Sequence, residues 1–116
     1  DDIMSKIVEI DDVKLLAAEV DSTDGKGLRE MADKLRDKHG SGVVAIGCPH
    51  EGEVNLLVAV ASDLTGKLHA GKLIAVLAEE VGGRGGGRPD LAQAGGSRPE
   101  KLASALSRVA DLVRNP

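Results

Sequence analysis

The sequence predicts a mixed α/β fold of the α+β type, in which about four to five strands form one mixed sheet and three helices pack on it. Two continuous apolar runs, residues 42–47 and 54–61, have the composition of buried central strands. Three further stretches repeat apolar residues at the three- and four-residue spacing of a helix with one buried face. These patterns follow the order ββαββα(β)α along 116 residues, a length that suits one domain.

The first predicted elements are a hairpin and a helix. Residues 6–10 and 13–20 are apolar-rich runs, and the acidic pair at residues 11–12 between them predicts a tight turn. Asp24 has the side chain of a helix N-cap, and Gly40 is a stop signal after the helix. The buried face of this helix consists of Leu28, Met31, Ala32 and Leu35.

The second half of the chain begins with a loop and a second helix. Residues 49–52 are expected to connect the two central strands as a hairpin loop. Residues 65–72 predict a turn into the second helix, which Gly82 ends. The apolar face of this helix consists of Leu73, Ile74, Leu77, Ala78 and Val81.

The last predicted elements are a short strand at residues 91–94 and a closing helix. Ser97 and Glu100 have the spacing of a capping box, and Pro99 falls in the first turn, where a missing N–H does no harm. The buried stripe of this helix consists of Leu102, Leu106, Val109 and Val113.

Composition and charge restrict the classes of function. The chain contains no aromatic residue, so it cannot recognise unpaired bases by stacking on Phe, Tyr or Trp. The net charge is −4, but residues 1–24 carry −6 while residues 66–101 carry +2. This separation favours binding to a limited patch of phosphates rather than to polyanions in general.

Metal and catalytic chemistry find little support in the sequence. Cys48 and His50 are two residues apart, but no second pair stands at ligand spacing, so we expect Cys48 to be a small core residue at a strand end. No nucleophile, base and orienting carboxylate can be assembled, so no catalytic residue is predicted. A single cysteine rules out an internal disulfide and is typical of a reducing compartment, so we expect a cytoplasmic protein. The chain has no run of apolar residues long enough to span a membrane.

The glycine-rich segment at residues 82–96 is the strongest candidate for a binding site. Seven of its fifteen residues are glycine, and two arginines stand among them. Bare backbone amides beside guanidinium groups are typical of anion sites, although a flexible surface loop would have the same composition. The predicted phosphate-binding residues are Arg84, Arg88, Gly83, Gly85, Gly86 and Gly87, with Lys67 and Lys72 as an extension or as solvated surface charges.

Other residues of the same segment have expected structural roles. Asp90 and Gln93 could keep the loop in shape by hydrogen bonds to its backbone. Gly95 and Gly96 are expected to serve the turn into the closing helix.

The residues of this segment carry a resemblance to a known family. Residues 82–96 resemble the glycine signature of the DHH-associated domain, and the stretch Arg-Pro-Asp-Leu-Ala-Gln-Ala-Gly-Gly at residues 88–96 resembles the branch found at the C-terminus of alanyl-tRNA synthetases. Residues 70–73 resemble the turn into the helix that precedes the glycines in that family. Many members have glycine where this chain has Arg84, so the resemblance supports Arg88 more than Arg84.

The resemblance implies a role in a larger enzyme. The parent synthetase attaches alanine to tRNA with ATP and Mg²⁺, and its zinc-containing editing domain clears wrongly charged tRNA. The DHH-associated domain binds the outer corner of the tRNA, and in some members it contributes to dimerisation. Residues 1–116 are therefore expected to be one tRNA-binding domain of a longer alanine–tRNA ligase, with no cofactor and no catalytic residue of its own.

Two alternatives remain open from the sequence. DHH phosphoesterases use a related glycine segment to hold a nucleic-acid substrate, so the chain could be the substrate-clamping domain of a nuclease. The apolar stripe at residues 102–113 could instead contact another subunit, which would make the chain an oligomerisation module.

Overall fold

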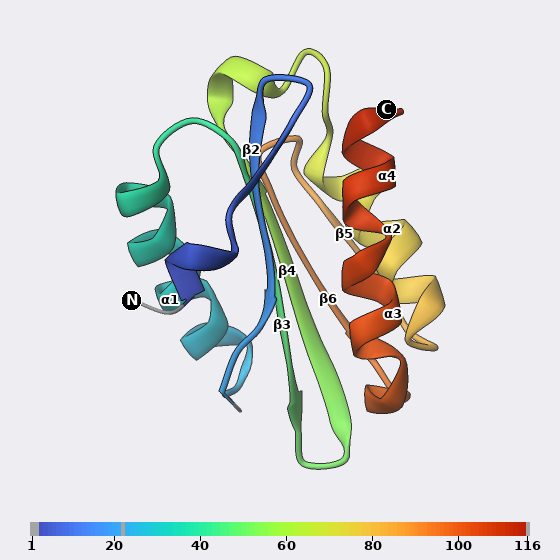
Figure 1. The fold of residues 1–116 in the computed structure, drawn as a ribbon. Helices are drawn as coiled ribbons and strands as arrows, with labels where there is room; N and C mark the ends of the chain where they lie inside the picture. Colours follow the sequence, from blue (N-terminus) through green and yellow to red (C-terminus); the bar gives the residue numbers. More distant parts are fainter. Residues whose placement is uncertain (1–2, 22, 116) are drawn as a thin grey trace.

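The architecture is a six-stranded sheet between two layers of helices (Figure 1). The computed structural model describes residues 3–21 and 23–115, so the opening Asp1-Asp2 pair lies outside the described residues. The strands lie in the order β1-β2-β3-β4-β6-β5, and every neighbouring pair is antiparallel except β2 and β3. Their bounds are Val8–Ile10 for β1, Val13–Glu19 for β2, Val43–His50 for β3, Glu53–Val60 for β4, Arg84–Gly87 for β5 and Leu91–Gly96 for β6.

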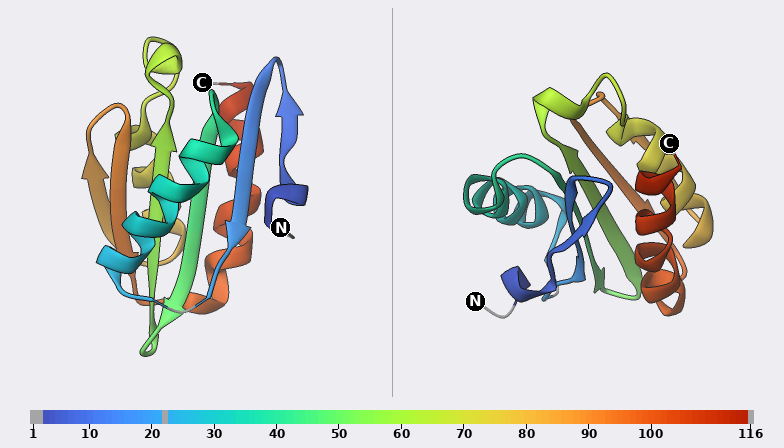
Figure 2. Two further views of the ribbon diagram at one scale, coloured as in Figure 1. Left: turned by 90° about the vertical axis from the view of Figure 1, so that its left-hand side faces the viewer. Right: turned by 45° about the horizontal axis from the view of Figure 1, so that its top comes forward.

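The helices cover the two faces of the sheet unequally (Figures 1 and 2). Helix α1 (Gly25–His39) packs on one face, against β3 and β4. The opposite face carries α2 (Ala70–Glu80) and the closing pair α3 (Leu102–Ser107) and α4 (Val109–Arg114). Short 3₁₀ turns occupy Ile3–Lys6, Ser62–Leu64 and Pro99–Lys101. The predicted fold class is confirmed, although the sheet has more strands than expected.

The N-terminal half follows its local signals closely. Asp11 and Asp12 both have positive φ, 48° and 71°, as a tight hairpin turn requires. The predicted first strand begins at Val8 rather than at Lys6, which belongs to the opening 3₁₀ turn. Asp24 caps α1, because its Oδ1 accepts a hydrogen bond of 2.8 Å from the backbone N–H of Gly27.

The glycine-rich segment differs from the prediction, because it is a hairpin rather than a loop. Strands β5 and β6 pair with each other through a turn at Pro89-Asp90, and β6 also pairs with β4. Strand β5 was not predicted, since a run of glycines has neither the alternation nor the side chains that identify a strand. Backbone pairing of β5 with β6, which itself pairs with the central strand β4, overrides this low propensity.

The start of the closing helix also corrects the prediction. Ser97 caps nothing, and its Oγ instead donates to the carbonyl of Gly82. The helix begins as a 3₁₀ turn at Pro99 without a side-chain cap, and it is interrupted at Arg108 between α3 and α4. The predicted stripe at residues 102–113 is nevertheless buried, because it packs on the sheet inside this chain.

Candidate nucleic-acid interface

The two predicted arginines lie on one open face of the sheet. Strand β5 forms the edge of the sheet and is exposed along its whole length. Arg84 is paired with Gly95 and Gly86 with Gln93, and directly paired residues share a face of the sheet. Gln93 contacts the first turn of α1, so the α1 side is the face that Arg84 and Gly86 share. The backbone N–H of Arg88 donates to the carbonyl of Leu91 at 3.0 Å, so these two residues continue the antiparallel pairing. Arg88 therefore lies on the same face as Arg84 and Gly86.

The opposite face of the hairpin has no room for side chains. A methyl carbon added at Gly85 would overlap the side chain of Ala94. One added at Gly87 would lie 2.7 Å from the Cα of Ala92. Both alanines belong to the α2 side of the core, so Gly85 and Gly87 permit close packing of β5 against β6.

These contacts change the expected role of the glycine amides. The N–H of Gly83 donates to the carbonyl of Ala78 at 2.8 Å, so it is not available to an anion as predicted. The antiparallel alternation directs the N–H of Gly86 toward β6 rather than outward. The same alternation directs the N–H groups of Gly85 and Gly87 away from β6, at the open edge of the sheet. Phosphate binding by these two amides and by the side chains of Arg84 and Arg88 stays a prediction.

Asp90 and Gln93 have partners other than those predicted. The carboxylate of Asp90 lies 3.5 Å from Nε of Arg88, and both side chains are largely exposed, 42% and 66% respectively. Nε2 of Gln93 donates to the carbonyl of Gly25 at 3.0 Å, so Gln93 ties β6 to α1 instead of bracing its own segment. Gly95 and Gly96 end β6, and the turn into the closing helix follows at Ser97 and Arg98.

The two predicted lysines line a hollow on the α2 side of the sheet, where the N–H of Ala70 donates to the carbonyl of Pro89 in the β5–β6 turn at 2.8 Å. Lys67 and Lys72 line a hollow of about 330 Å³ at the start of α2, on the opposite side of the sheet from α1. His69 caps this helix, because its Nδ1 accepts a hydrogen bond of 3.2 Å from the N–H of Lys72. The structure therefore brings the two lysines together on the opposite face of the sheet from Arg84 and Gly86.

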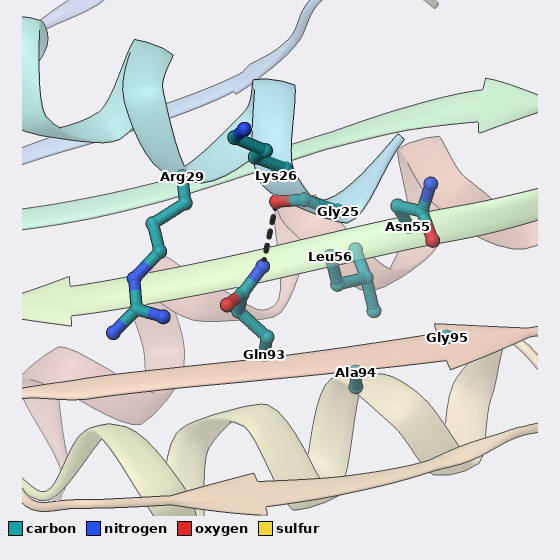
Figure 3. Close-up of a pocket in the computed structure, with 8 residues that line it drawn as sticks. All are labelled: Gly25, Lys26, Arg29, Asn55, Leu56, Gln93, Ala94 and Gly95. Carbon is teal, nitrogen blue, oxygen red and sulfur yellow. Dashed lines mark hydrogen bonds between the residues drawn. The ribbon is translucent and has the colours of Figure 1, made fainter. Parts of the chain in front are cut away.

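A second hollow, of about 500 Å³, opens between the first turn of α1 and strands β4 and β6 (Figure 3). Lys26 and Arg29 reach it from α1, Asn55 from β4 and Gln93 from β6. Three of these residues were not predicted as site residues: Lys26, Arg29 and Asn55. One signal was present, because the first turn of α1 has no acidic residue and carries Lys26, where the helix dipole disfavours a cation.

Cys48 has the predicted structural role. It is fully buried on the α1 side of the sheet, and its Sγ donates to the carbonyl of Thr23 at 3.3 Å. Burial raises the pKa of this thiol, which disfavours the reactive thiolate. Within residues 3–21 and 23–115, no three or more His, Cys, Asp or Glu side chains come together as metal ligands would. None of the helices described there has the length and apolar character needed to cross a bilayer.

Comparison with known proteins places this fold and segment in a family. The family model of the DHHA1 domain matches residues 12–115. The alanine–tRNA ligase of Pseudoalteromonas translucida is 50% identical over 92% of the chain, and that of Anaeromyxobacter dehalogenans is 53% identical over 97%. The chain spans only 12% of the length of each ligase.

A solved structure agrees with this assignment. The C-Ala domain of the Aquifex aeolicus alanyl-tRNA synthetase superposes with a TM-score of 0.85 at 28% sequence identity. The match covers 95% of this chain and 99% of that domain. The chain therefore belongs to the DHHA1 domain family and is similar to the members that form part of alanyl-tRNA synthetases.

Proposed function

We propose that this chain is a non-catalytic tRNA-binding module of an alanine–tRNA ligase, and that it binds the outer corner of the tRNA. The observation that carries the proposal is that Arg84, in the edge strand β5, and Arg88, directly after it, lie on one exposed face of the hairpin. The relatives are alanine–tRNA ligases, which makes an alanine-accepting tRNA the nucleic acid to expect.

The chemistry of this face suits a sugar-phosphate backbone. Guanidinium groups bind phosphates through two parallel hydrogen bonds, and they need no base contact to do so. Gly86 stands between the two arginines, and the space where its side chain would lie is empty. An RNA backbone can therefore approach the strand closely between two positive charges.

The charge of the rest of the chain limits binding to this face. The net charge of −4 repels polyanions from most of the surface, so only a local cluster of cations attracts them. Such a module binds weakly alone, and connection to the rest of the synthetase raises its effective concentration at the tRNA. In this proposal aminoacylation and its cofactors ATP, Mg²⁺ and Zn²⁺ belong to other parts of a cytoplasmic parent enzyme.

The test is a titration of fluorescently labelled alanine tRNA with the domain at several salt concentrations. Arg88→Ala should weaken binding by about tenfold and reduce the slope of log affinity against log salt by ~1. Arg114→Ala is the matched control, because Arg114 is also an exposed arginine paired with an aspartate, at 3.2 Å from Asp111. Equal affinities and slopes for the wild type and Arg88→Ala would contradict the proposal.

A further inference from the structure

The floor of the hollow between α1 and β6 presents two oriented amide groups (Figure 3). Nδ2 of Asn55 donates to the carbonyl of Thr23, and Nε2 of Gln93 donates to the carbonyl of Gly25, both at 3.0 Å. A carbonyl only accepts hydrogen bonds, so each amide must direct its nitrogen at the backbone. The oxygens of Asn55 and Gln93 are then left as acceptors with fixed orientations.

The rim of the hollow carries two cations. Lys26 and Arg29 are exposed, and neither has an ion-pair partner among the described residues. Further along the same helix, Arg36 lies 3.9 Å from the carboxylate of Asp33. Because a cation in the first turn of a helix is disfavoured by the dipole, Lys26 is placed at a cost to helix stability. Local costs of this kind are typical of functional positions.

Gly95 keeps the floor of the hollow open. A methyl carbon added there would lie 3.6 Å from the carbonyl oxygen of Val54 and 4.0 Å from Oδ1 of Asn55, which are ordinary contact distances. Packing therefore does not require glycine at this position, in contrast to Gly85, where a side chain would overlap Ala94. The missing side chain instead leaves the amide oxygen of Asn55 accessible from the hollow.

We propose that this hollow receives one nucleotide of the RNA, an inference that rests on the proposed function. Lys26 and Arg29 bind the phosphates of that nucleotide. The oxygens of Asn55 and Gln93 accept hydrogen bonds from a neutral donor, which is either the ribose 2′-hydroxyl or a base amino group. A phosphate alone does not match this site, because its oxygens would face the two acceptors on the floor.

The first test removes the amide oxygen of Gln93 and keeps a side-chain donor for the hydrogen bond to the carbonyl of Gly25. In Gln93→Lys the ammonium can still donate to the carbonyl of Gly25, but the acceptor becomes a cation. A surface that binds only phosphates would bind tRNA more tightly after this change. The proposal predicts binding that is about three- to tenfold weaker, and an equal loss in the neutral variant Gln93→Met. Circular dichroism of both variants checks that the fold is retained.

The second test fills the hollow. Gly95→Ala should weaken tRNA binding by about threefold without changing thermal stability. Gly66→Ala is the control, because it also has open space around the added methyl carbon but lies outside the hollow, in the turn before α2. Titration with a transcript carrying 2′-fluorine in place of the hydroxyl then separates the two donors. Loss of affinity identifies the hydroxyl, and retained affinity identifies the base amino group.

The outcomes separate this inference from the function on which it rests. If Gln93→Lys and Gly95→Ala bind tRNA as tightly as the wild type or more tightly, while Arg88→Ala binds weakly, the hollow is not a nucleotide site and the proposed function remains. If the wild type binds no tRNA at any salt concentration, both proposals are overturned.

Discussion

Glycine has different roles on the two faces of the β5–β6 hairpin. On the α2 side, side chains at Gly85 and Gly87 would collide with β6. On the α1 side, Gly86 has empty space around it and stands between two exposed arginines. Glycine therefore serves packing at alternate positions and access at the positions between them. Substitutions on the closed face should reduce stability, and those on the open face should reduce binding.

The largest expected effect is on the closed face. Gly85→Ala should lower the free energy of unfolding by about 3 kcal/mol, because the new methyl group overlaps Ala94 and the edge strand must move. Thermal unfolding followed by circular dichroism measures the change. Gly86→Ala is the control in the adjacent position, and it should change stability by less than ~0.5 kcal/mol. Equal losses in the two variants would remove the distinction between the faces.

The next effect is on the open face. Replacing both Arg84 and Arg88 by alanine should weaken tRNA binding by about 30-fold, or ~2 kcal/mol, and lower the salt slope by ~2. The free energy of unfolding should stay within ~0.5 kcal/mol of the wild type, because both side chains are exposed. A double variant with a much lower free energy of unfolding but an unchanged affinity for tRNA would contradict the roles assigned to the two faces.

A smaller effect should come from Asp90. Its carboxylate lies beside Arg88 and competes with a phosphate for the guanidinium group. Asp90→Asn should therefore tighten tRNA binding by about two- to threefold, with the largest gain at low salt, as fluorescence titration can measure. In the background of Arg88→Ala most of the gain should disappear. A gain of the same size in that background would mean that Asp90 does not act through Arg88.

The smallest expected effect is on stability, at Glu80 beside α3. Hydrogen bonds from Ser104 at 2.9 Å and from Arg108 at 3.1 Å lower the pKa of Glu80, with Ser104 the larger cause. A lowered carboxyl pKa adds stability above the ordinary pKa of glutamate, and that stability is lost as pH falls through the folded value. Glu80→Gln should therefore lower the melting temperature slightly near neutral pH and not in strong acid. A deficit that is independent of pH would contradict this.

Local signals predicted most of the fold. The turn at Asp11 and Asp12, the cap at Asp24 and the apolar runs of β3 and β4 each act within a few residues, so the sequence alone identifies them. Strand β5 was missed because glycine leaves no pattern, and its conformation depends on pairing with β6. The capping box at Ser97 was wrong because the closing helix begins one residue later, with Arg98 in the N-cap position before the 3₁₀ turn at Pro99. The hydroxyl of Ser97 donates to the carbonyl of Gly82.

The candidate site was predictable only where its residues are close in sequence. Arg84 and Arg88 stand four positions apart in one glycine-rich segment, so composition was enough to find them. Arg29, Asn55 and Gln93 come from α1, β4 and β6, and they meet only because β6 pairs with β4 and the first turn of α1 crosses both strands. Residues brought together by long-range pairing leave no local pattern.

Footprinting of alanine tRNA by this chain shows whether Arg84 and Arg88 bind the outer corner. Backbone cleavage is compared with and without protein at the outer corner, the acceptor stem and the anticodon arm. We expect protection of the outer corner by the wild type and loss of that protection when Arg84 and Arg88 are both alanine. Protection confined to the acceptor stem or anticodon arm, or an unchanged footprint with the double variant, would contradict it.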